Sequence, residues 1–283
     1  ITAPDRPAGR GRKLQQSAVK EFAASKNLPI LQPTNLKDPD FIKELESLKP
    51  NLQVVVAFRM LPKVVWQLPE YGTFNLHASL LPQYRGAAPI NWAIINGETI
   101  TGASTFFIDE KIDTGAMILQ KETPIEPDEN VGRLHDRLMV LGAELVVETL
   151  ALIKEDKVHT TIQEESDTLN EAPKLTKENT RIDWSLSLDH IYNFIRGLNP
   201  YPAAWTLIKN GELELKAKLF DVEKLLEAHS TEIGKIIQEN NKIKIAVRDG
   251  FLLVNEIQLP GKRKMKTKEL LNGYQFEIGA KVL

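Results

Sequence analysis

The sequence predicts an α/β layer fold followed by a small β-barrel. Strand-like and helix-like segments alternate over the first 156 residues, which is typical of α/β layers. Later, apolar residues alternate on both sides of Asp249-Gly250, a dipeptide that strongly indicates a hairpin. The 283 residues correspond to about two domains, at roughly 100–200 residues each. We therefore predict domains at 1–156 and 175–283, with a linker at 157–174.

The opening 14 residues predict a loop. Two prolines and two glycines interrupt this stretch, and four basic residues charge it. Downstream, Val19, Phe22 and Ala23 fall on one face of a predicted helix. Apolar residues at 41–48 predict a second helix. The β-branched run at 52–58 predicts a strand covered on both faces, as strands of parallel sheets are.

The alternation of strands and helices continues through the middle of the chain. Residues 72–79 predict a strand, and Pro89 suits the first turn of a short helix after it. Two further strands, predicted at 102–108 and 116–120, flank an acidic loop. A long helix is predicted at 131–154, with a buried stripe of four leucines: Leu134, Leu138, Leu141 and Leu145.

The sequence becomes polar near residue 157. The polar stretch that follows has no sustained period, which is why we predict a linker there. Leu188, Ile191 and Ile195 then share one face of a short predicted helix, which Asn-Pro-Tyr-Pro ends. The remaining sequence is mainly strand-like. Five basic residues gather near its end: Lys262, Arg263, Lys264, Lys266 and Lys268.

The composition limits the possible functions. Hydrophobic residues make up 42% of the chain and charged residues 26%, which is ordinary for a globular protein. The net charge of −2 means that any surface for nucleic acid must be a local patch. The chain has no cysteine, which excludes disulfides, thiolate nucleophiles and cysteine zinc sites. These features fit a reducing compartment, and we expect a cytoplasmic protein.

The apolar runs and the first residues of the chain indicate where the protein resides and where its natural sequence begins. The longest apolar runs are too short to cross a membrane, and no stretch has the pattern of a signal peptide. The chain begins with Ile1 and enters a turn at once. We therefore expect the natural N-terminus to lie upstream of this residue.

Two polar residues on the predicted strand at 72–79 indicate chemistry. The pleat directs Asn75 and His77 to the same side of the strand, with Cα atoms about 6.6 Å apart at ~3.3 Å per residue. Acyl transfer needs such a pair. A tetrahedral oxyanion requires a preorganised neutral donor such as an asparagine amide. An attacking amine must also lose a proton, which histidine can take near neutral pH.

A carboxylate should orient the histidine, and the acidic loop supplies three. Asp109, Glu110 and Asp113 all lie between two predicted strands. We favour Asp113, because it precedes Thr114-Gly115, where the chain must turn tightly into the next strand.

Each of these features also has an ordinary structural explanation. A lone histidine in a strand is more often structural than catalytic, an asparagine at a strand end often binds backbone groups, and acidic loops are usually solvated. Their combination favours a site. Competing patterns are absent: there is no G-x-S-x-G, P-loop or G-x-G-x-x-G motif. The five histidines have no metal-ligand spacing among them.

Four segments together resemble the folate-dependent formyltransferase family. They are "PDRPAGRGRKL" from Pro4, "NLHASLLPQYRGAAPINWAI" from Asn75, "IDEKIDTGAMI" from Ile108 and "IDWSLSLDHIYNFIRGLNPYPAAW" from Ile182. The resemblance covers essentially the whole chain. It implies a Rossmann-like N-terminal domain, a linker, and a C-terminal barrel related to the OB-fold.

The resemblance also implies a reaction. In the family, a formyl group moves from the co-substrate 10-formyltetrahydrofolate to the α-amino group of methionine on initiator methionyl-tRNA. No metal is required for that chemistry. Carried over to this chain, Asn75 is the oxyanion donor, His77 the proton handler and Asp113 its polarising partner. Folate contacts are expected at eight residues: Arg59, Met60, Leu61, Ser79, Leu80, Leu81, Pro82 and Asp109.

Two basic regions are expected to meet tRNA. In the family the opening segment meets the acceptor end, so Arg10 is expected to enter the acceptor stem with Arg12 and Lys13 beside it. The C-terminal barrel is expected to bind phosphates through Lys262, Arg263 and Lys264. The expected partners are tRNA and folate, without DNA or a membrane, and we expect a monomer.

The chain departs from the family pattern in two places. The family begins with a strand and a Gly-Thr-Pro turn, and nothing here matches them. We therefore expect the first strand and helix to be missing, with Ile1 inside the second strand. The segment "VAFRMLPK" is one residue shorter than many family versions, so its folate contacts are expected to differ in detail.

Two alternatives stay open. A formyltransferase that acts on a nucleotide-linked amino sugar would share the His-x-Ser-Leu-Leu-Pro core. The arginine-rich opening segment and the basic C-terminal cluster favour tRNA instead. A non-catalytic RNA-binding protein on the same scaffold would not need Asn75, His77 and Asp113 together.

Overall fold

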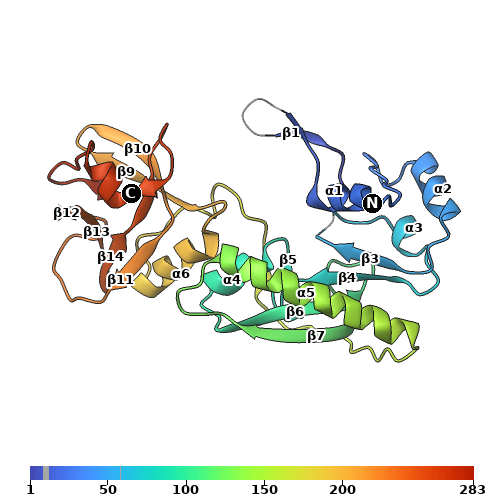
Figure 1. Ribbon diagram of the computed structural model, residues 1–283. Helices are drawn as coiled ribbons and strands as arrows, with labels where there is room; N and C mark the ends of the chain where they lie inside the picture. The colour runs from blue at the N-terminus through green and yellow to red at the C-terminus, as the bar shows by residue number, and fades with distance from the viewer. Residues whose placement is uncertain (9–12, 58) are drawn as a thin grey trace. The chain divides into compact units, whose positions relative to one another are not determined.

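The computed structural model describes residues 1–8, 13–57 and 59–283, which form two compact units (Figure 1). The first unit comprises Ile1–Asn75 and Phe107–Glu110, and the second comprises Leu76–Phe106 and Lys111–Leu283. Arg10 and Arg12, two residues predicted to bind tRNA, lie outside the described residues, as does the side chain of Lys13.

The first unit begins with a short antiparallel strand pair instead of the predicted loop, since Arg6 pairs with Gln15 and Ala8 with Lys13. Both predicted helices are present. The second of them is capped by Asp38, whose side chain accepts hydrogen bonds from the backbone, and Pro39 suits its first turn. The elements of this unit are β1 (Arg6–Ala8), β2 (Lys13–Gln15), α1 (Ala18–Ser25), α2 (Pro39–Ser47), β3 (Gln53–Val56), α3 (Lys63–Trp66) and the start of β4 (Thr73–His77).

Burial in the first unit is lower than the sequence predicts. Its core consists of Leu36, Phe41, Leu45 and Val65, and none of the residues of α1 is buried. Strand β3 was predicted to be covered on both faces, and that prediction is wrong, because Val54 and Val56 are exposed. A β-branched run favours the extended backbone on either kind of face, so it cannot report which faces are covered.

The second unit opens with the last two residues of β4 and continues with helices and strands as predicted. Strands β6 and β7 pair antiparallel, and α5 runs alongside them (Figure 1). Helix α5 buries Leu134, Leu138 and Leu145 but leaves Leu141 half-buried. Gly142 is buried in its place, close against Leu76. The elements are β5 (Arg85–Gly86), α4 (Pro89–Ile95), β6 (Ile100–Phe107), β7 (Met117–Pro124) and α5 (Val131–Lys154).

The predicted linker contributes a strand of its own. Within it, β8 (Glu171–Ala172) pairs in parallel with β5, so that Gly86 lies opposite Ala172. The remaining part of the linker is largely without regular structure. The domain limits predicted at 156 and 175 stay a prediction.

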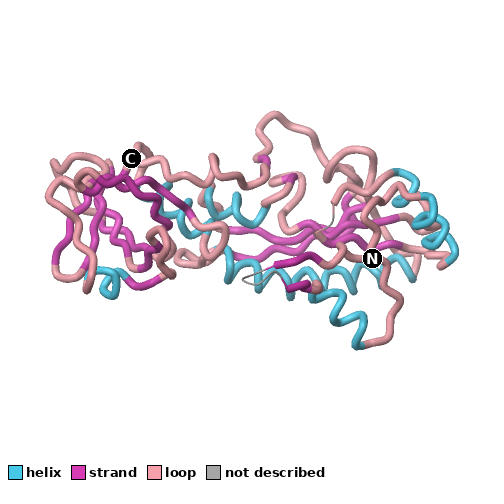
Figure 2. Tube along the Cα trace, turned by 90° about the horizontal axis from the view of Figure 1, so that it is seen from above, coloured by secondary structure: helices cyan, strands magenta, loops and turns pink. Residues whose placement is uncertain are grey.

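The C-terminal part consists mainly of strands, as predicted (Figure 2), and these strands pair antiparallel. The hairpin at Asp249-Gly250 is confirmed, since Val247 pairs with Gly250. Leu188, Ile191 and Ile195 of α6 (Leu188–Leu198) are all buried. One sheet has the order β16 (Met265–Lys266), β15 (Glu256–Gln258), β10 (Leu213–Leu219), β9 (Ala204–Asn210), β17 (Lys281–Val282); the other has β11 (Val222–Leu225), β14 (Gly250–Val254), β13 (Lys242–Val247), β12 (Ile236–Glu239); α7 (Thr267–Leu271) follows β16.

The described strands of this part form two separate sheets, and no closed barrel is found among them. An alternating pattern specifies one apolar face for each strand, but it does not specify how the sheet edges meet. None of the helices in the described ranges is both long and apolar enough to cross a membrane.

Candidate active site

His77 is a buried histidine at the end of β4. Its side chain is only 7% exposed. Its Nε2 atom lies 2.8 Å from the backbone oxygen of Tyr84. Because a carbonyl oxygen can only accept a hydrogen bond, Nε2 must carry the proton in this contact. The other ring nitrogen, Nδ1, is therefore the one that can take up or release a proton.

Asp113 lies on the Nδ1 side of the ring. Its Oδ2 atom is 3.7 Å from Nδ1 of His77 and accepts a hydrogen bond from the backbone N–H of Gly86 at 3.0 Å. The distance to Nδ1 exceeds that of a hydrogen bond, but it brings the carboxylate close enough to attract the imidazole whenever the ring is protonated. The predicted pairing of His77 with Asp113 is thus present, and the structure selects Asp113 for this position.

Tyr84 is itself held firmly. Its hydroxyl group donates to Oε1 of Glu98 at 2.6 Å and accepts from the amide of Asn96. Burial, followed by the hydrogen bond to Glu98, raises the pKa of the Tyr84 phenol above its ordinary value. The hydrogen bonds to Glu98 and Asn96 hold the side chain of the residue whose backbone carbonyl binds His77.

Asn75 differs from His77 in its contacts. It lies one residue away from Leu76 and two from His77 on β4. Its Oδ1 atom is buried and has no hydrogen-bond partner among the described residues. A buried amide oxygen without a partner is uncommon, and such a group calls for an explanation.

Ser79 to Pro82, predicted to bind folate, form a tightly bonded turn. Ser79 is fully buried, and its Oγ donates to the backbone oxygen of Gln83 at 2.7 Å. Ser104 on β6 donates to the backbone oxygen of Ser79 at 2.6 Å and accepts from the backbone N–H of Leu81 at 3.1 Å. Gln120 on β7 donates to the oxygen of Leu81 at 3.0 Å. These contacts fix the backbone of the turn.

Sequence reasoning did not identify Ser104 and Gln120 as parts of this turn. They lie on strands far along the chain, and no local pattern links a strand serine to a turn 25 residues earlier. Only the pairing of β6 with β7, which places Ser104 opposite Gln120, brings the two side chains together.

The other predicted folate residues belong to the first unit. The guanidinium group of Arg59 donates to the backbone oxygens of Pro33 at 2.6 Å and Thr34 at 3.0 Å. Leu61 packs against the small core of that unit, whereas Met60 is exposed. Asp109 is exposed too. Their contacts with folate stay a prediction.

The predicted phosphate-binding cluster near the C-terminus is already partly neutralised. Arg263 lies 2.9 Å from a carboxylate oxygen of Glu269, and Lys264 lies 2.7 Å from one of Glu256. Lys262 is exposed and has no carboxylate partner within the described part of the chain. The count of basic residues in the sequence therefore overstates the charge that is available here.

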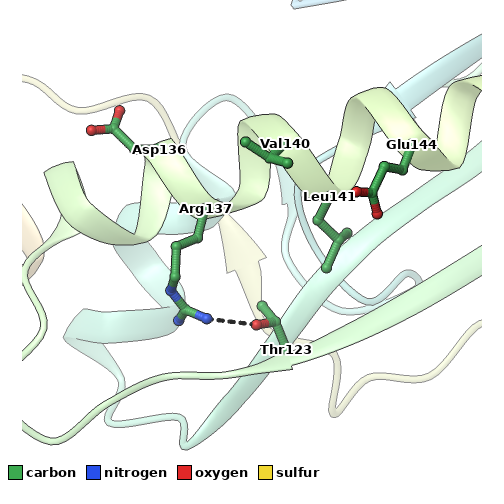
Figure 3. Close-up of a pocket in the computed structure, with 6 residues that line it drawn as sticks. All are labelled: Thr123, Asp136, Arg137, Val140, Leu141 and Glu144. Atoms are coloured by element: carbon green, nitrogen blue, oxygen red, sulfur yellow. Dashed lines mark hydrogen bonds between the residues drawn. The ribbon is translucent and has the colours of Figure 1, made fainter.

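A surface hollow lies elsewhere, between α5 and β7 (Figure 3). Arg137 crosses it to donate to Oγ1 of Thr123 at 2.8 Å, and a bidentate contact with buried Glu129 holds the same guanidinium group. None of the predicted site residues lines this hollow, which is formed by Thr123, Asp136, Arg137, Val140, Leu141 and Glu144. No group of three or more histidine and acidic residues in the described ranges could hold a metal ion.

Two family models match the chain. The model described as "Formyl transferase" matches residues 1–150, and "Formyl transferase, C-terminal domain" matches residues 174–275. A methionyl-tRNA formyltransferase of Flavobacterium johnsoniae is 61% identical over 282 residues, which span 100% of this chain and 90% of that protein. Another, of Bacteroides thetaiotaomicron, is 53% identical over 287 residues, 100% of this chain and 89% of that protein.

Solved structures show a similar fold. HypX from Aquifex aeolicus, in complex with tetrahydrofolic acid, has a TM-score of 0.60 at 23% identity over 83% of this chain. The match spans only 41% of the HypX chain. An N-formyltransferase from Helicobacter canadensis, in complex with folinic acid and dTDP-3-aminofucose, has a TM-score of 0.63 at 18% identity, over 88% of this chain and 85% of that one. At these identities the likeness shows the fold alone.

Proposed function

The chain belongs to the methionyl-tRNA formyltransferase family, and from that premise we propose how its residues carry out the reaction. A formyl group is transferred from 10-formyltetrahydrofolate to the α-amino group of methionine on initiator methionyl-tRNA, which then serves translation initiation. The observation that supports our assignment of residues is the buried His77, whose Nε2 is bound to a carbonyl oxygen while Nδ1 lies beside the carboxylate of Asp113.

His77 handles the proton in this proposal. The attacking amine must lose a proton as its nitrogen bonds to the formyl carbon, and Nδ1 is the nitrogen of His77 free to accept it. The imidazolium that results lies beside Asp113, whose carboxylate stabilises the positive charge at 3.7 Å. The same nitrogen then returns the proton to N10 of the folate as the bond from N10 to the formyl carbon breaks. The proton count balances, and no covalent enzyme intermediate forms.

Asn75 handles the negative charge. Its Nδ2 amide is a neutral donor for the oxyanion that develops on the formyl oxygen. Its buried Oδ1 has no donor among the residues that the structure describes, and the N–H groups of an incoming α-amine would supply one. One side chain would then bind both reacting groups, which would orient the amine toward the formyl carbon.

The remaining assignments follow from the family. We propose folate contacts at Arg59, Met60, Leu61 and Asp109 and at the turn Ser79–Pro82. We also propose a cytoplasmic monomer with a Rossmann-like domain at 1–156 and an OB-fold-like domain at 175–283, a division supported by matches at 1–150 and 174–275. tRNA contacts are proposed at six basic residues, Arg10, Arg12, Lys13, Lys262, Arg263 and Lys264.

A direct test compares two histidines that each neighbour an aspartate. The chain would be incubated with 10-formyltetrahydrofolate and methionine-charged initiator tRNA, and formylmethionine measured after hydrolysis. His77→Ala should abolish most of the transfer. His135→Ala is the matched control, because His135 is exposed on α5 and lies 3.3 Å from Asp136. Equal turnover in the two variants would refute the role of His77.

The same assay tests the substrate. Transfer to methionyl-tRNA with none to an amino-sugar nucleotide is the expected result. The opposite result would keep the chemistry of Asn75, His77 and Asp113 but assign the chain a sugar substrate.

A further inference from the structure

Gln163 lies in the predicted linker, yet it is a buried polar residue, at 5% exposure. Its amide reaches the loop that carries Asp113. We infer that Gln163 is a positioning residue for formyl transfer, which acts by holding the turn at Asp113–Gly115 and thereby the carboxylate beside His77. This inference rests on the proposed function of His77 and Asp113.

The amide of Gln163 is fully used. Its Nε2 donates to the backbone oxygen of Asp113 at 3.0 Å and to that of Gly115 at 2.8 Å. Its Oε1 accepts from Nε and Nη2 of Arg85, at 3.1 and 2.9 Å. An amide has two donor hydrogens and an acceptor oxygen with two lone pairs, so all four are engaged. Because arginine can only donate, Arg85 fixes which end of the amide faces the turn.

The turn needs such support. Asp113 has a φ of +57°, a left-handed conformation that residues other than glycine seldom adopt and that costs energy. This conformation directs the carboxylate to the backbone N–H of Gly86 and toward Nδ1 of His77. The two hydrogen bonds from Gln163 join the carbonyls at both ends of the turn, so they oppose its relaxation to a more common backbone conformation.

The same segment also holds the opposite side of the histidine. The backbone oxygen of Asn170 accepts from the N–H of Tyr84 at 2.6 Å, and that of Ala172 accepts from the N–H of Ala87 at 2.7 Å. Tyr84 supplies the carbonyl that binds Nε2 of His77. Residues 163–172 therefore contact the backbone around both partners of the imidazole, one on each ring nitrogen.

The sharpest test replaces the donor and keeps the shape. Gln163→Glu is nearly isosteric and can still bind Arg85, but its second carboxylate oxygen would face the carbonyls of Asp113 and Gly115 without a hydrogen to donate. We expect kcat for formyl transfer to fall by roughly 10–100-fold, the scale for a misplacement of about 1 Å at a reacting group. KM for methionyl-tRNA and for 10-formyltetrahydrofolate should change by less than about twofold, because the lost interaction matters in the transition state.

Glu164→Gln is the matched control, since it makes the reverse exchange at the adjacent, exposed position. It should leave kcat unchanged. If Gln163→Glu does not fold, as judged by its thermal unfolding, Gln163→Met provides an unbranched side chain of similar length that lacks the donor without adding charge, and the same fall in kcat is expected.

A double-mutant cycle separates positioning from a general structural role. If Gln163 acts through Asp113, Gln163→Glu should cost almost nothing further in kcat when Asp113 is already Ala. Additive losses would overturn the inference, as would full activity of Gln163→Glu in the otherwise unchanged chain. A different result, in which Asp113→Ala alone keeps full turnover, would instead refute the proposed role of Asp113.

Discussion

Asn75 and His77 are separated by a single residue on β4, and their surroundings are opposite. The Nε2 atom of His77 is bound to the carbonyl oxygen of Tyr84, and its Nδ1 atom lies 3.7 Å from the carboxylate of Asp113. The Oδ1 atom of Asn75 is buried and has none among the described residues. In the proposed mechanism, the fold itself assembles the surroundings of the proton-handling residue His77, whereas substrate completes those of the charge-stabilising residue Asn75. Stability and activity should therefore respond differently to changes at the two positions.

The largest effect is expected at His77. His77→Ala should lower kcat by about 100–10,000-fold, the range for a lost proton-transfer group. It should also reduce the free energy of unfolding by about 1–3 kcal/mol, because the buried carbonyl of Tyr84 loses its donor. Single-turnover kinetics and denaturant unfolding would measure the two quantities. A His77→Ala variant that loses activity but keeps full stability would show that the contact of His77 with Tyr84 does not stabilise the fold.

Asn75→Ala should lower kcat without lowering the free energy of unfolding. We expect kcat to fall by roughly 100–1,000-fold, the cost of one lost oxyanion donor. Stability should be unchanged or higher, because the substitution removes a buried oxygen that has no partner in the described structure. Parallel measurements on His77→Ala provide the reference. A loss of stability as large as that of His77→Ala would show that Oδ1 of Asn75 contributes to the fold.

A smaller effect on kcat is expected from a substitution of Gly86, whose backbone N–H binds the carboxylate of Asp113. Gly86 has a φ of +126°, and a Cβ atom there would lie 2.5 Å from the backbone oxygen of Ala172. Gly86→Ala should therefore destabilise the chain by about 1–3 kcal/mol, the cost of a strained backbone position. It should also lower kcat, since the N–H of Gly86 binds the carboxylate of Asp113.

The matched control for that prediction is Gly273→Ala. Gly273 has no atom within 4 Å of the position of an added Cβ. Its substitution should change stability by no more than about 0.5 kcal/mol, as for ordinary surface positions. Equal destabilisation by the two variants would mean that the close approach to Ala172 is not the cause.

The smallest effects are expected on tRNA affinity, from the basic residues near the C-terminus. Some of these residues form ion pairs and Lys262 forms none among the described residues. Removing a true phosphate contact should reduce the slope of log affinity for tRNA against log salt by about 0.7–0.9. Lys262→Ala should approach that change. Arg263→Ala and Lys264→Ala should fall short of it, because each of these cations already lies against a carboxylate. Equal slopes for all three variants would contradict this ranking.

The parts of the structure that could be predicted from the sequence depend on local patterns. Helix α5 begins and ends as its apolar period indicates, and the hairpin at Asp249-Gly250 follows from turn chemistry. The pairing of His77 with Asp113 could also be predicted, because acyl transfer requires a carboxylate near the imidazole and the tight turn at Gly115 favoured one of three candidates.

What the sequence could not predict depends on contacts between distant segments. Gln163 lies in a polar stretch without a period, and nothing local distinguishes it from the exposed Glu164. The carbonyl of Tyr84 that binds His77 is a backbone group, which any residue would supply. The exposure of Val56 depends on which segments cover β3, and a β-branched run carries no information about that.

The parallel pairing of β5 with β8 has a consequence for how the chain can be divided. A catalytic fragment cut at the end of α5 would keep Asn75, His77 and Asp113 but would lose the strand opposite Gly86. In a chimera with the C-terminal half of a relative, the fusion point should therefore lie after Ala172, so that β5 and β8 come from the same protein. The polar segment after α5 resembles a dispensable linker in the sequence, but a functional chimera must keep it together with β5.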